Sequence, residues 1–265
     1  MSSDFIKYPR TPHLVGSRLQ PGDDASGQIP VGDLTDGILV IEEKIDGANA
    51  GISFDADGRL MLQSRGHPLA GGPREAQFAL LKAWAQTIEP DLREVLGRRY
   101  IVYGEWCFAK HTVFYDRLPH YFLEFDVFDR ENGRFLSTPA RRALLDGLPI
   151  VSVPVLHEGR VATRKALEAL IAPSLYKSDD WEAALAAAAS ETGQDPARIA
   201  RETDRSRRSE GLYVKQERDD RVIGRYKFVR ADFLQAILAS GSHWADRPIV
   251  ANRLAPGVDL FGGLA

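Results

Sequence analysis

The segment EEKIDGANAGI, residues 42–52, joins an apolar strand-like run to a lysine and a tight turn. Lys44 follows the run ILVI and precedes the turn at Asp46 and Gly47, with Asn49 shortly after. A lysine at the end of a strand is either a reactive amine or an exposed surface residue. The pattern K-x-D-G does not decide between them, because three common residue types recur at this spacing by chance. Motifs elsewhere in the chain are needed to distinguish a reactive lysine from an exposed one.

Strand and helix patterns alternate along the sequence on both sides of this segment. Runs rich in β-branched and aromatic residues, several joined by short turns, predict strands at 37–45, 50–55, 59–65, 99–106, 121–129 and 210–229. Capping residues and apolar residues at helical spacing, such as Phe78, Leu81, Trp84 and Ala85, predict helices at 74–88, 138–148, 180–193 and 231–241. Hairpins interrupted by helices favour an α+β fold with antiparallel sheets over a regular βαβ array.

Composition narrows the class of protein. The chain of 265 residues, with 44% apolar and 27% charged residues, suits a globular domain with an ample core. Its apolar runs are shorter than the roughly 20 residues that cross a bilayer, and its N-terminus lacks a signal-peptide pattern, which predicts a cytoplasmic protein without a membrane partner. The single cysteine, Cys107, excludes an intramolecular disulfide and a cysteine-based metal site.

The net charge of −3 does not exclude a nucleic-acid partner, because a polyanion contacts one face of a protein and not its average. Basic residues gather at 7–18, 96–100 and 200–211. Each of these clusters is compatible with a polyanion site and also with an ordinary solvated surface.

Five further motifs follow Lys44, and each places a charged residue on a predicted strand or beside one. They are SRG at 64–66, YGEW at 103–106, FLEFDVFD at 122–129, SEGLYVK at 209–215 and RYKFV at 225–229. With K-x-D-G they form a collinear set over residues 44–227 that resembles the covalent nucleotidyltransferase superfamily, which comprises ATP-dependent polynucleotide ligases and mRNA capping enzymes. Asn49 gives the form K-x-D-G-x-N, which is similar to the RNA ligase branch. The resemblance implies an α+β, ATP-grasp-like nucleotidyltransferase domain of antiparallel β-sheets flanked by helices.

The resemblance also implies roles for individual residues. Lys44 would attack the α-phosphorus of ATP to give lysyl-AMP, and attack requires an amine whose pKa is lowered from the ordinary value of about 10.4. Asp46 would orient the amine or, with Glu210, hold Mg²⁺ or Mn²⁺, for which carboxylate oxygens are suitable ligands. Glu105 would contact the ribose. The other residues implied at the nucleotide are Glu43, Asn49, Arg65, Phe125, Lys215, Arg225 and Lys227, of which Arg225 and Lys227 would also take part in catalysis.

Two of these roles leave alternatives open. Phe125 would stack on adenine, but strand alternation puts it with Leu123 and Val127 on an apolar face, where core packing is the alternative. Arg225 occupies a position that is lysine in the resembled RNA ligases, so a planar fork replaces a point charge. Arg225 and Lys227 share strand parity, which predicts that both emerge on one face.

The sequence therefore predicts an ATP-dependent RNA ligase that joins RNA 3′-hydroxyl and 5′-phosphate ends through lysyl-AMP and an adenylylated RNA 5′ end. The alternatives are a minimal DNA nick ligase and a nucleotide-binding or RNA-binding module without turnover. We expect the nucleotidyltransferase domain at 1–230 and a short C-terminal helix and tail at 231–265, with no OB domain of the kind that DNA ligases and capping enzymes append. That arrangement suggests a separate end-healing kinase or phosphatase as a partner. Residues 7–18 either line the 5′-phosphate or 3′-hydroxyl site or form a surface loop.

Overall fold

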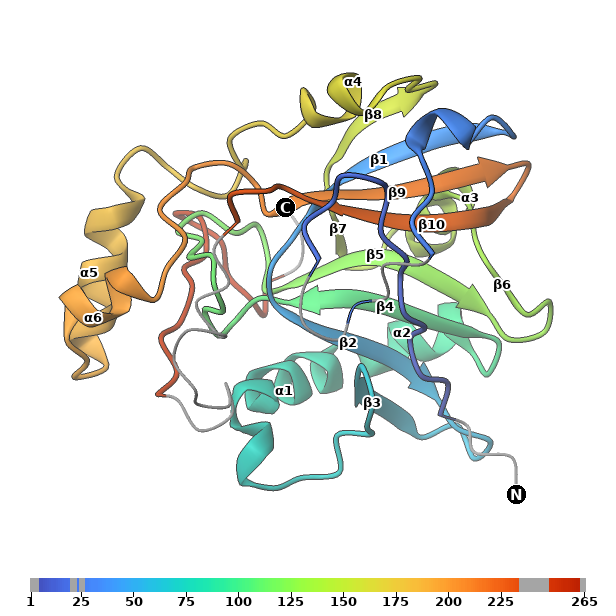
Figure 1. Cartoon of the computed structure of the whole chain (residues 1–265). Helices are drawn as coiled ribbons and strands as arrows, with labels where there is room; N and C mark the ends of the chain where they lie inside the picture. The colour runs from blue at the N-terminus through green and yellow to red at the C-terminus, as the bar shows by residue number, and fades with distance from the viewer. Residues whose placement is uncertain (1–4, 20–22, 24–26, 234–247, 263–265) are drawn as a thin grey trace.

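The computed structural model describes residues 5–19, 23, 27–233 and 248–262, and its strands form two sheets (Figure 1). The four-stranded sheet is antiparallel with the order β10-β9-β1-β8, where β1 is Ile38–Lys44, β8 is Val155–Gly159, β9 is Gly211–Arg218 and β10 is Arg221–Val229. The second sheet has the order β3-β2-β4-β5-β6, with β2 at Ala48–Phe54, β3 at Leu60–Ser64, β4 at Tyr100–Trp106, β5 at Phe122–Asp129 and β6 at Arg134–Phe135. The short strand β7 (Val151–Ser152) pairs with β5 in parallel.

Strand β1 connects the two sheets. It is buried along most of its length because β8 and β9 cover both of its edges and both faces pack against other elements. The chain leaves β1 at Lys44, turns through residues 45–47 and enters β2 of the second sheet. The lysine of the K-x-D-G motif therefore lies where the two sheets meet.

Helices cover the sheets and extend from one end of them. The 3₁₀ helix η2 (Pro73–Phe78) leads into α1 (Ala79–Thr87), which is followed by α2 (Glu89–Leu96). The four residues predicted to share a helical face, Phe78, Leu81, Trp84 and Ala85, are all buried in one core with residues of β2, β4 and β5. The remaining helices are η1 (Val31–Asp33), α3 (Thr138–Leu145), α4 (Arg164–Glu168), α5 (Trp181–Glu191) and α6 (Pro196–Arg201). Helices α5 and α6 pack together on the left of Figure 1, the side on which β9 begins.

The register of the four-stranded sheet separates its side chains into two faces. Leu39, Ile41, Leu212, Val214 and Phe228 fill a core on one face. Direct pairing of β1, β9 and β10 places charged and polar side chains on the opposite face, namely Glu42, Lys44, Tyr213, Lys215, Arg225 and Lys227. That face is directed toward the six-stranded sheet, which Lys215 contacts through Asp126.

Two segments outside the strands complete the body. His13 bridges to Lys227 in parallel, and the backbone N–H of Leu14 donates to the Lys227 carbonyl at 3.0 Å, so residues 12–14 extend the sheet beyond β10. Near the other end of the chain, Asn252 is buried, and its side chain donates to the Cys107 carbonyl at 2.8 Å. Residues 248–262 thus pack onto the same body as the sheets.

The α+β fold with antiparallel sheets, predicted from the sequence, is confirmed. Every predicted strand is present within a few residues, and the predicted helices at 138–148 and 180–193 correspond to α3 and α5. The predicted helix at 74–88 begins with a 3₁₀ segment, and the one predicted at 231–241 lies outside the described residues beyond position 233. In the described parts of the chain, no helix is long and apolar enough to cross a membrane.

Candidate active site

The Lys44 amine lies next to a buried carboxylate at the junction of the sheets. Lys44 pairs with Gly211 at the start of β9, which brings the preceding residue, Glu210, beside it. The Lys44 Nζ donates to Glu210 Oε2 at 2.7 Å, and only 25% of the Lys44 side chain and 4% of the Glu210 side chain are exposed. The predicted nucleophile and the predicted metal ligand therefore form an ion pair.

Gly47 allows a third carboxylate to approach this pair. A Cβ atom at position 47 would lie 2.8 Å from the Trp106 carbonyl oxygen and 3.0 Å from Glu105 Cγ, so glycine is required here for close approach. The backbone of Gly47 forms a hydrogen bond with the Glu105 carboxyl group. Asn49 lies directly opposite Glu105 in the pairing of β2 with β4. The turn therefore joins Glu105 and Asn49 to the surroundings of Lys44.

Asp46 is held by the backbone of a distant loop. Its Oδ2 accepts hydrogen bonds from the backbone N–H groups of Thr112 and Val113, both at 2.7 Å. The Asp46 N–H donates to the Tyr115 hydroxyl at 2.9 Å. These three bonds fix the K-x-D-G turn, and they leave Oδ1 as the oxygen of Asp46 that can face an amine or a cation.

The charge of this cluster is unbalanced, because three carboxylates surround one amine. Burial raises the pKa of Glu210 to about 7 and that of Glu105 to about 8, although Lys44 opposes both shifts. Burial also favours the neutral form of Lys44, but Glu210, Glu105 and Asp46 together outweigh burial and raise the Lys44 pKa. The lowered pKa expected for the nucleophile is therefore not what the structure shows, because the carboxylates stabilise the ammonium form.

A second cation, Lys227, lies close to the cluster. Burial lowers its pKa, and the positive charge of Lys44 lowers it further. Lys227 Nζ lies 3.3 Å from Asp23 Oδ1, and Asp23 Oδ2 lies 2.9 Å from His13 Nε2. Residues 12–14 of the basic N-terminal segment thus run beside the strand that carries Lys227, and their place is at the edge of the candidate site (Figure 1).

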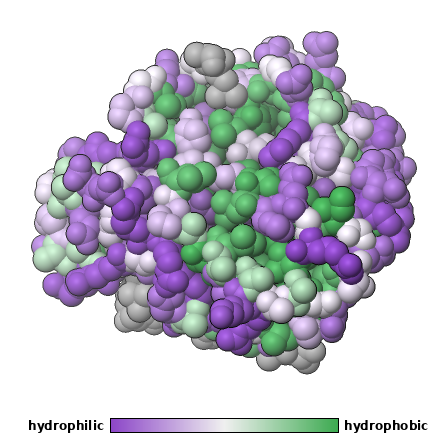
Figure 2. All heavy atoms as spheres, turned by 90° about the horizontal axis from the view of Figure 1, so that it is seen from above, coloured by the Kyte–Doolittle hydropathy of each residue, from purple (hydrophilic) through white to green (hydrophobic). Residues whose placement is uncertain are grey.

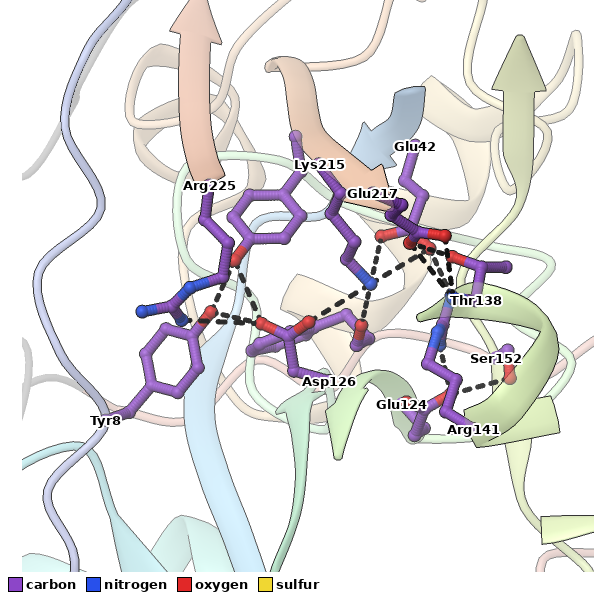
Figure 3. A network of polar contacts seen from close by, with 12 residues as sticks. Tyr8, Glu42, Glu124, Asp126, Thr138, Arg141, Ser152, Lys215, Glu217 and Arg225 are labelled. Atoms are coloured by element: carbon purple, nitrogen blue, oxygen red, sulfur yellow. Dashed lines mark hydrogen bonds and ion pairs between the residues drawn. The ribbon is translucent and has the colours of Figure 1, made fainter. Parts of the chain in front are cut away.

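Lys215 belongs to a buried network that joins the two sheets (Figure 3). Its side chain is fully buried, and its Nζ lies 3.1 Å from Glu42 Oε2 and 3.1 Å from Asp126 Oδ1. It also donates to the Phe125 carbonyl. Arg141 of α3 contacts Glu42 in the same network. The structure therefore places Lys215 among buried carboxylates, and its predicted contact with a nucleotide stays a prediction.

Arg225 lies in the same network, against aromatic rings (Figure 3). Its Nη1 is 3.5 Å from Asp126 Oδ2, and its guanidinium carbon is 3.8 Å from the centre of the Phe135 ring and 5.1 Å from that of Tyr8. A planar guanidinium stacks on rings more readily than an ammonium, which accounts for arginine at this position. Arg225 and Lys227 emerge on one face, as strand parity predicts, but the partners of Arg225 lie outside the Lys44 cluster.

A β-bulge removes Phe125 from the strand alternation. Glu124 and Asp126 each have a partner on β4, whereas Phe125 between them has none. The half-buried Phe125 ring lies 5.4 Å from the ring of Tyr8 and 5.8 Å from that of Tyr213. The simple alternation assumed from the sequence therefore fails at this residue, and stacking of Phe125 on a base stays a prediction.

The sequence of this chain matches the RNA ligase family over residues 37–229, which is most of its length. The chain belongs to the RNA ligase family. Its fold is similar to that of solved RNA ligases from Naegleria gruberi. A mutant with ATP and Mn gives a TM-score of 0.54 at 15% identity, and the enzyme with PPi gives 0.54 at 17% identity, each match covering 87% of this chain and 57% of that chain. A second mutant, with AMP and Mn, gives 0.54 at 15% identity with the same coverage.

This member of the RNA ligase family therefore spans less than two thirds of the length of those Naegleria structures. No curated protein matches the sequence.

The side chains of the candidate site suit a hydrated divalent cation. Among the residues that the structure describes, no group of three histidine, cysteine, aspartate or glutamate side chains is arranged to hold a metal. Glu210 and Asp46 Oδ1 offer two carboxylate positions, and the raised pKa values of Glu210 and Glu105 indicate a shortage of positive charge. Mg²⁺ typically binds one or two carboxylates and keeps its remaining ligands as water and phosphate oxygens. The predicted metal ligands therefore fit such an ion.

Two residues predicted at the nucleotide lie away from Lys44. Glu43 points to the opposite face of β1, where the Ser174 side chain and the Leu175 backbone form hydrogen bonds to it and burial raises its pKa to about 7. Arg65 is exposed in the loop after β3, and no ion pair of its side chain occurs within the described part of the chain.

Several residues that build the candidate site were not predicted from the sequence. Tyr115 fixes the turn, Asp23 contacts Lys227, and Arg141 binds a glutamate of β1. A signal for the network was present, because Glu42 and Asp126 interrupt otherwise apolar strands and a buried carboxylate requires a partner. Tyr115 and Asp23 carry no comparable local signal.

Proposed function

We propose that this member of the RNA ligase family is an ATP-dependent RNA ligase that joins 3′-hydroxyl and 5′-phosphate ends. The observation that carries the proposal is the ion pair of Lys44 with Glu210 at 2.7 Å, within a cluster that includes Glu105 and Asp46. A module that only binds nucleotides would not need an amine held among three carboxylates at the junction of its sheets. The ATP, AMP and Mn named for the Naegleria gruberi RNA ligases support the same cosubstrate and metal class.

In the first step, Lys44 Nζ forms a bond to the α-phosphorus of ATP while the bond from that phosphorus to pyrophosphate breaks. Lys44 must first lose a proton, because the surrounding carboxylates favour its ammonium form. Glu210 lies 2.7 Å away and has a pKa of about 7, so it is placed to accept that proton and release it to water. Glu210 and Asp46 would hold a divalent cation, which would supply charge screening at the phosphates, and a Glu210 carboxylate engaged in this way would no longer pair with Lys44. Burial of Lys44 then favours the neutral amine.

The second and third steps use the same residues. The AMP passes from Lys44 to the RNA 5′-phosphate, which frees the amine and forms an adenylylated 5′ end. The RNA 3′-hydroxyl then attacks the 5′-phosphorus, a phosphodiester forms, and AMP leaves. Lys44 and Lys227 supply positive charge near each phosphorus in turn, and positioning together with such charge accounts for most of the catalysis in phosphoryl transfer.

A sealing assay tests this function. Purified protein is incubated with ATP, a divalent cation and either a nicked RNA or the matched nicked DNA. Sealing of RNA that requires a 5′-phosphate, that is lost in Lys44→Ala and that is kept in Lys165→Ala, a change at an exposed lysine of α4, is the expected result. Sealing of DNA alone would assign a DNA nick ligase, and binding of ATP without sealing would assign a binding module.

A further inference from the structure

A cavity of about 440 Å³ is lined in part by Arg230, whose backbone N–H donates to the carbonyl of Glu210. Its lining comes from the last residue of α6, the loop between α6 and β9 and the chain just after β10, and consists of Arg201, Thr203, Asp204, Arg205, Ser206, Arg230 and Asp232. Three arginines and two aspartates give this lining a net positive charge. A phosphate with its attached sugar is small enough for a cavity of this size.

Two of the arginines are available to a ligand. Arg207 and Arg208 in the same loop form ion pairs with Asp179 and Asp232. Arg201 and Arg205 are exposed, and within the described residues neither forms an ion pair or a side-chain hydrogen bond. Unpaired arginines at the mouth of a cavity favour an anion, because a guanidinium binds phosphate oxygens through paired N–H groups.

The third arginine, Arg230, forms the floor of the cavity. Its side chain is only 3% exposed and is held by Asp204 and Asp232 and by a hydrogen bond from its Nε to the Ser209 carbonyl at 2.9 Å. Its Nη1 lies 3.1 Å from Asp232 Oδ1. The guanidinium is therefore fixed in the lining, where it adds a positive charge that favours a phosphate oxygen.

The wall of the cavity is fixed from behind. Buried Lys177 donates to the carbonyls of Asp204 at 3.5 Å and Ser206 at 2.7 Å, and its amine lies 3.6 Å from the centre of the Trp181 ring in α5. Lys177 therefore connects the loop that lines the cavity to helix α5. These contacts hold the backbone of the loop that carries the arginines in place.

The cavity also lies within reach of the reacting groups. The backbone N–H of Arg230 donates to the carbonyl of Glu210 at 3.1 Å, and Glu210 is paired with Lys44. Arg205 precedes Glu210 by five residues, which span at most about 17 Å. In the view from above, hydrophilic residues interspersed with pale apolar ones lie on the left flank of the molecule, the side on which α5 and α6 lie (Figure 2).

We propose that this cavity binds a backbone phosphate of the RNA strand whose end is held at Lys44. The inference rests on the proposed function, and it assigns the substrate a path from the Lys44 cluster toward the α6 side of the molecule. RNA is favoured over a free nucleotide because the lining shares no residue with the Lys44 cluster and holds Arg201 and Arg205 at exposed positions, which suits a ligand that extends past the reacting groups.

Binding of RNA at several salt concentrations tests the proposal. Arg201→Ala with Arg205→Ala removes the two exposed guanidinium groups that would contact this phosphate, so the slope of log K against log salt is expected to fall by about 0.7 for a single strand. Affinity is expected to fall by about tenfold or more. Covalent labelling of Lys44 by ATP should keep its rate and its KM for ATP. Arg205→Glu, which reverses one charge, should weaken RNA binding more than Arg205→Ala does.

The matched control is Arg142→Ala with Arg160→Ala, which removes the same charge at exposed positions on α3 and after β8. This control should bind RNA as the unchanged protein does. An unchanged salt slope in the cavity variant, or an equal loss in the control, would overturn the proposal. A raised KM for ATP in the cavity variant would overturn it too, since the cavity would then serve the nucleotide. If Lys44 is never labelled but the salt slopes differ as stated, the ligase function fails while the RNA site stands.

Discussion

Removal of Arg141 should destabilise the protein strongly, because this residue joins the two sheets from α3. Arg141 is fully buried and binds Glu42 of β1 through Nη2 and Glu124 of β5 through Nη1 (Figure 3). Arg141→Met keeps the volume roughly but leaves two buried carboxylates short of a partner. Loss of one member of a buried ion pair typically costs about 3–5 kcal/mol. For a chain of this length that corresponds to a fall in Tm of roughly 6–10 °C.

The structure also predicts which of the two carboxylates, Glu42 or Glu124, is left with fewer partners when Arg141 is removed. Without Arg141, Glu42 keeps Lys215 at 3.1 Å, whereas among the described residues Glu124 keeps only the Ser152 hydroxyl at 2.6 Å. Adding Glu124→Gln to Arg141→Met should therefore recover about 1–3 kcal/mol, more than adding Glu42→Gln does. Thermal and denaturant unfolding of the single and double variants measure these differences as a double-mutant cycle.

The neighbouring residue on the same helix provides the control. Arg142 is exposed, so Arg142→Met should change stability by less than about 0.5 kcal/mol. If Arg141→Met has the same Tm as Arg142→Met, the network does not hold the sheets together. If Glu42→Gln rescues better than Glu124→Gln, the assignment of partners within the network is wrong.

Three further predictions follow from the site. Glu43 has a pKa of about 7 in the fold, so the folded state keeps a proton that the unfolded state loses above pH 4.5. The free energy of unfolding should therefore fall by up to about 3 kcal/mol as the pH rises to 7. Unfolding measured at pH 5 and at pH 8 should show a smaller fall in Glu43→Gln. Gly47→Ala forces a Cβ to 2.8 Å from the Trp106 carbonyl and should slow labelling of Lys44 by about tenfold or more. The control Gly27→Ala, at an exposed position with open space around it, should not slow labelling, and equal rates in the two variants would contradict this account. A chelator should abolish labelling, and Mg²⁺ or Mn²⁺ should restore it without a change in Tm; labelling in excess chelator would remove the metal from the mechanism.

Most of the fold follows from local signals in the sequence. The long strands such as β1 and β5 are rich in β-branched and aromatic residues, and their turns carry glycine and aspartate. The strands β6, β7 and β8 and the helices α2, α4 and α6 were not predicted, because segments of two to eight residues carry too weak a periodic pattern. The pairing of residues 12–14 with β10 depends on a contact across more than two hundred positions, which no local pattern reveals.

The candidate site was predicted in part. The motifs identified Lys44, Glu105 and Glu210, and pairing of β1 with β9 brings Lys44 and Glu210 together. The direction of the Lys44 pKa shift could not be read from residue types, because it depends on how closely three carboxylates approach one amine. The bulge at Phe125 was equally hidden, since strand parity assumes a regular ladder.

The central claim is that Lys44 becomes covalently attached to AMP. The decisive measurement is incubation of the folded protein, freed of bound AMP, with α-labelled ATP and a divalent cation, followed by denaturing electrophoresis and peptide mapping. We predict a label on the peptide that contains Lys44, lost in Lys44→Arg, whose guanidinium stays protonated, and kept in Lys165→Arg. Absence of the label, or its persistence in Lys44→Arg, would contradict the account.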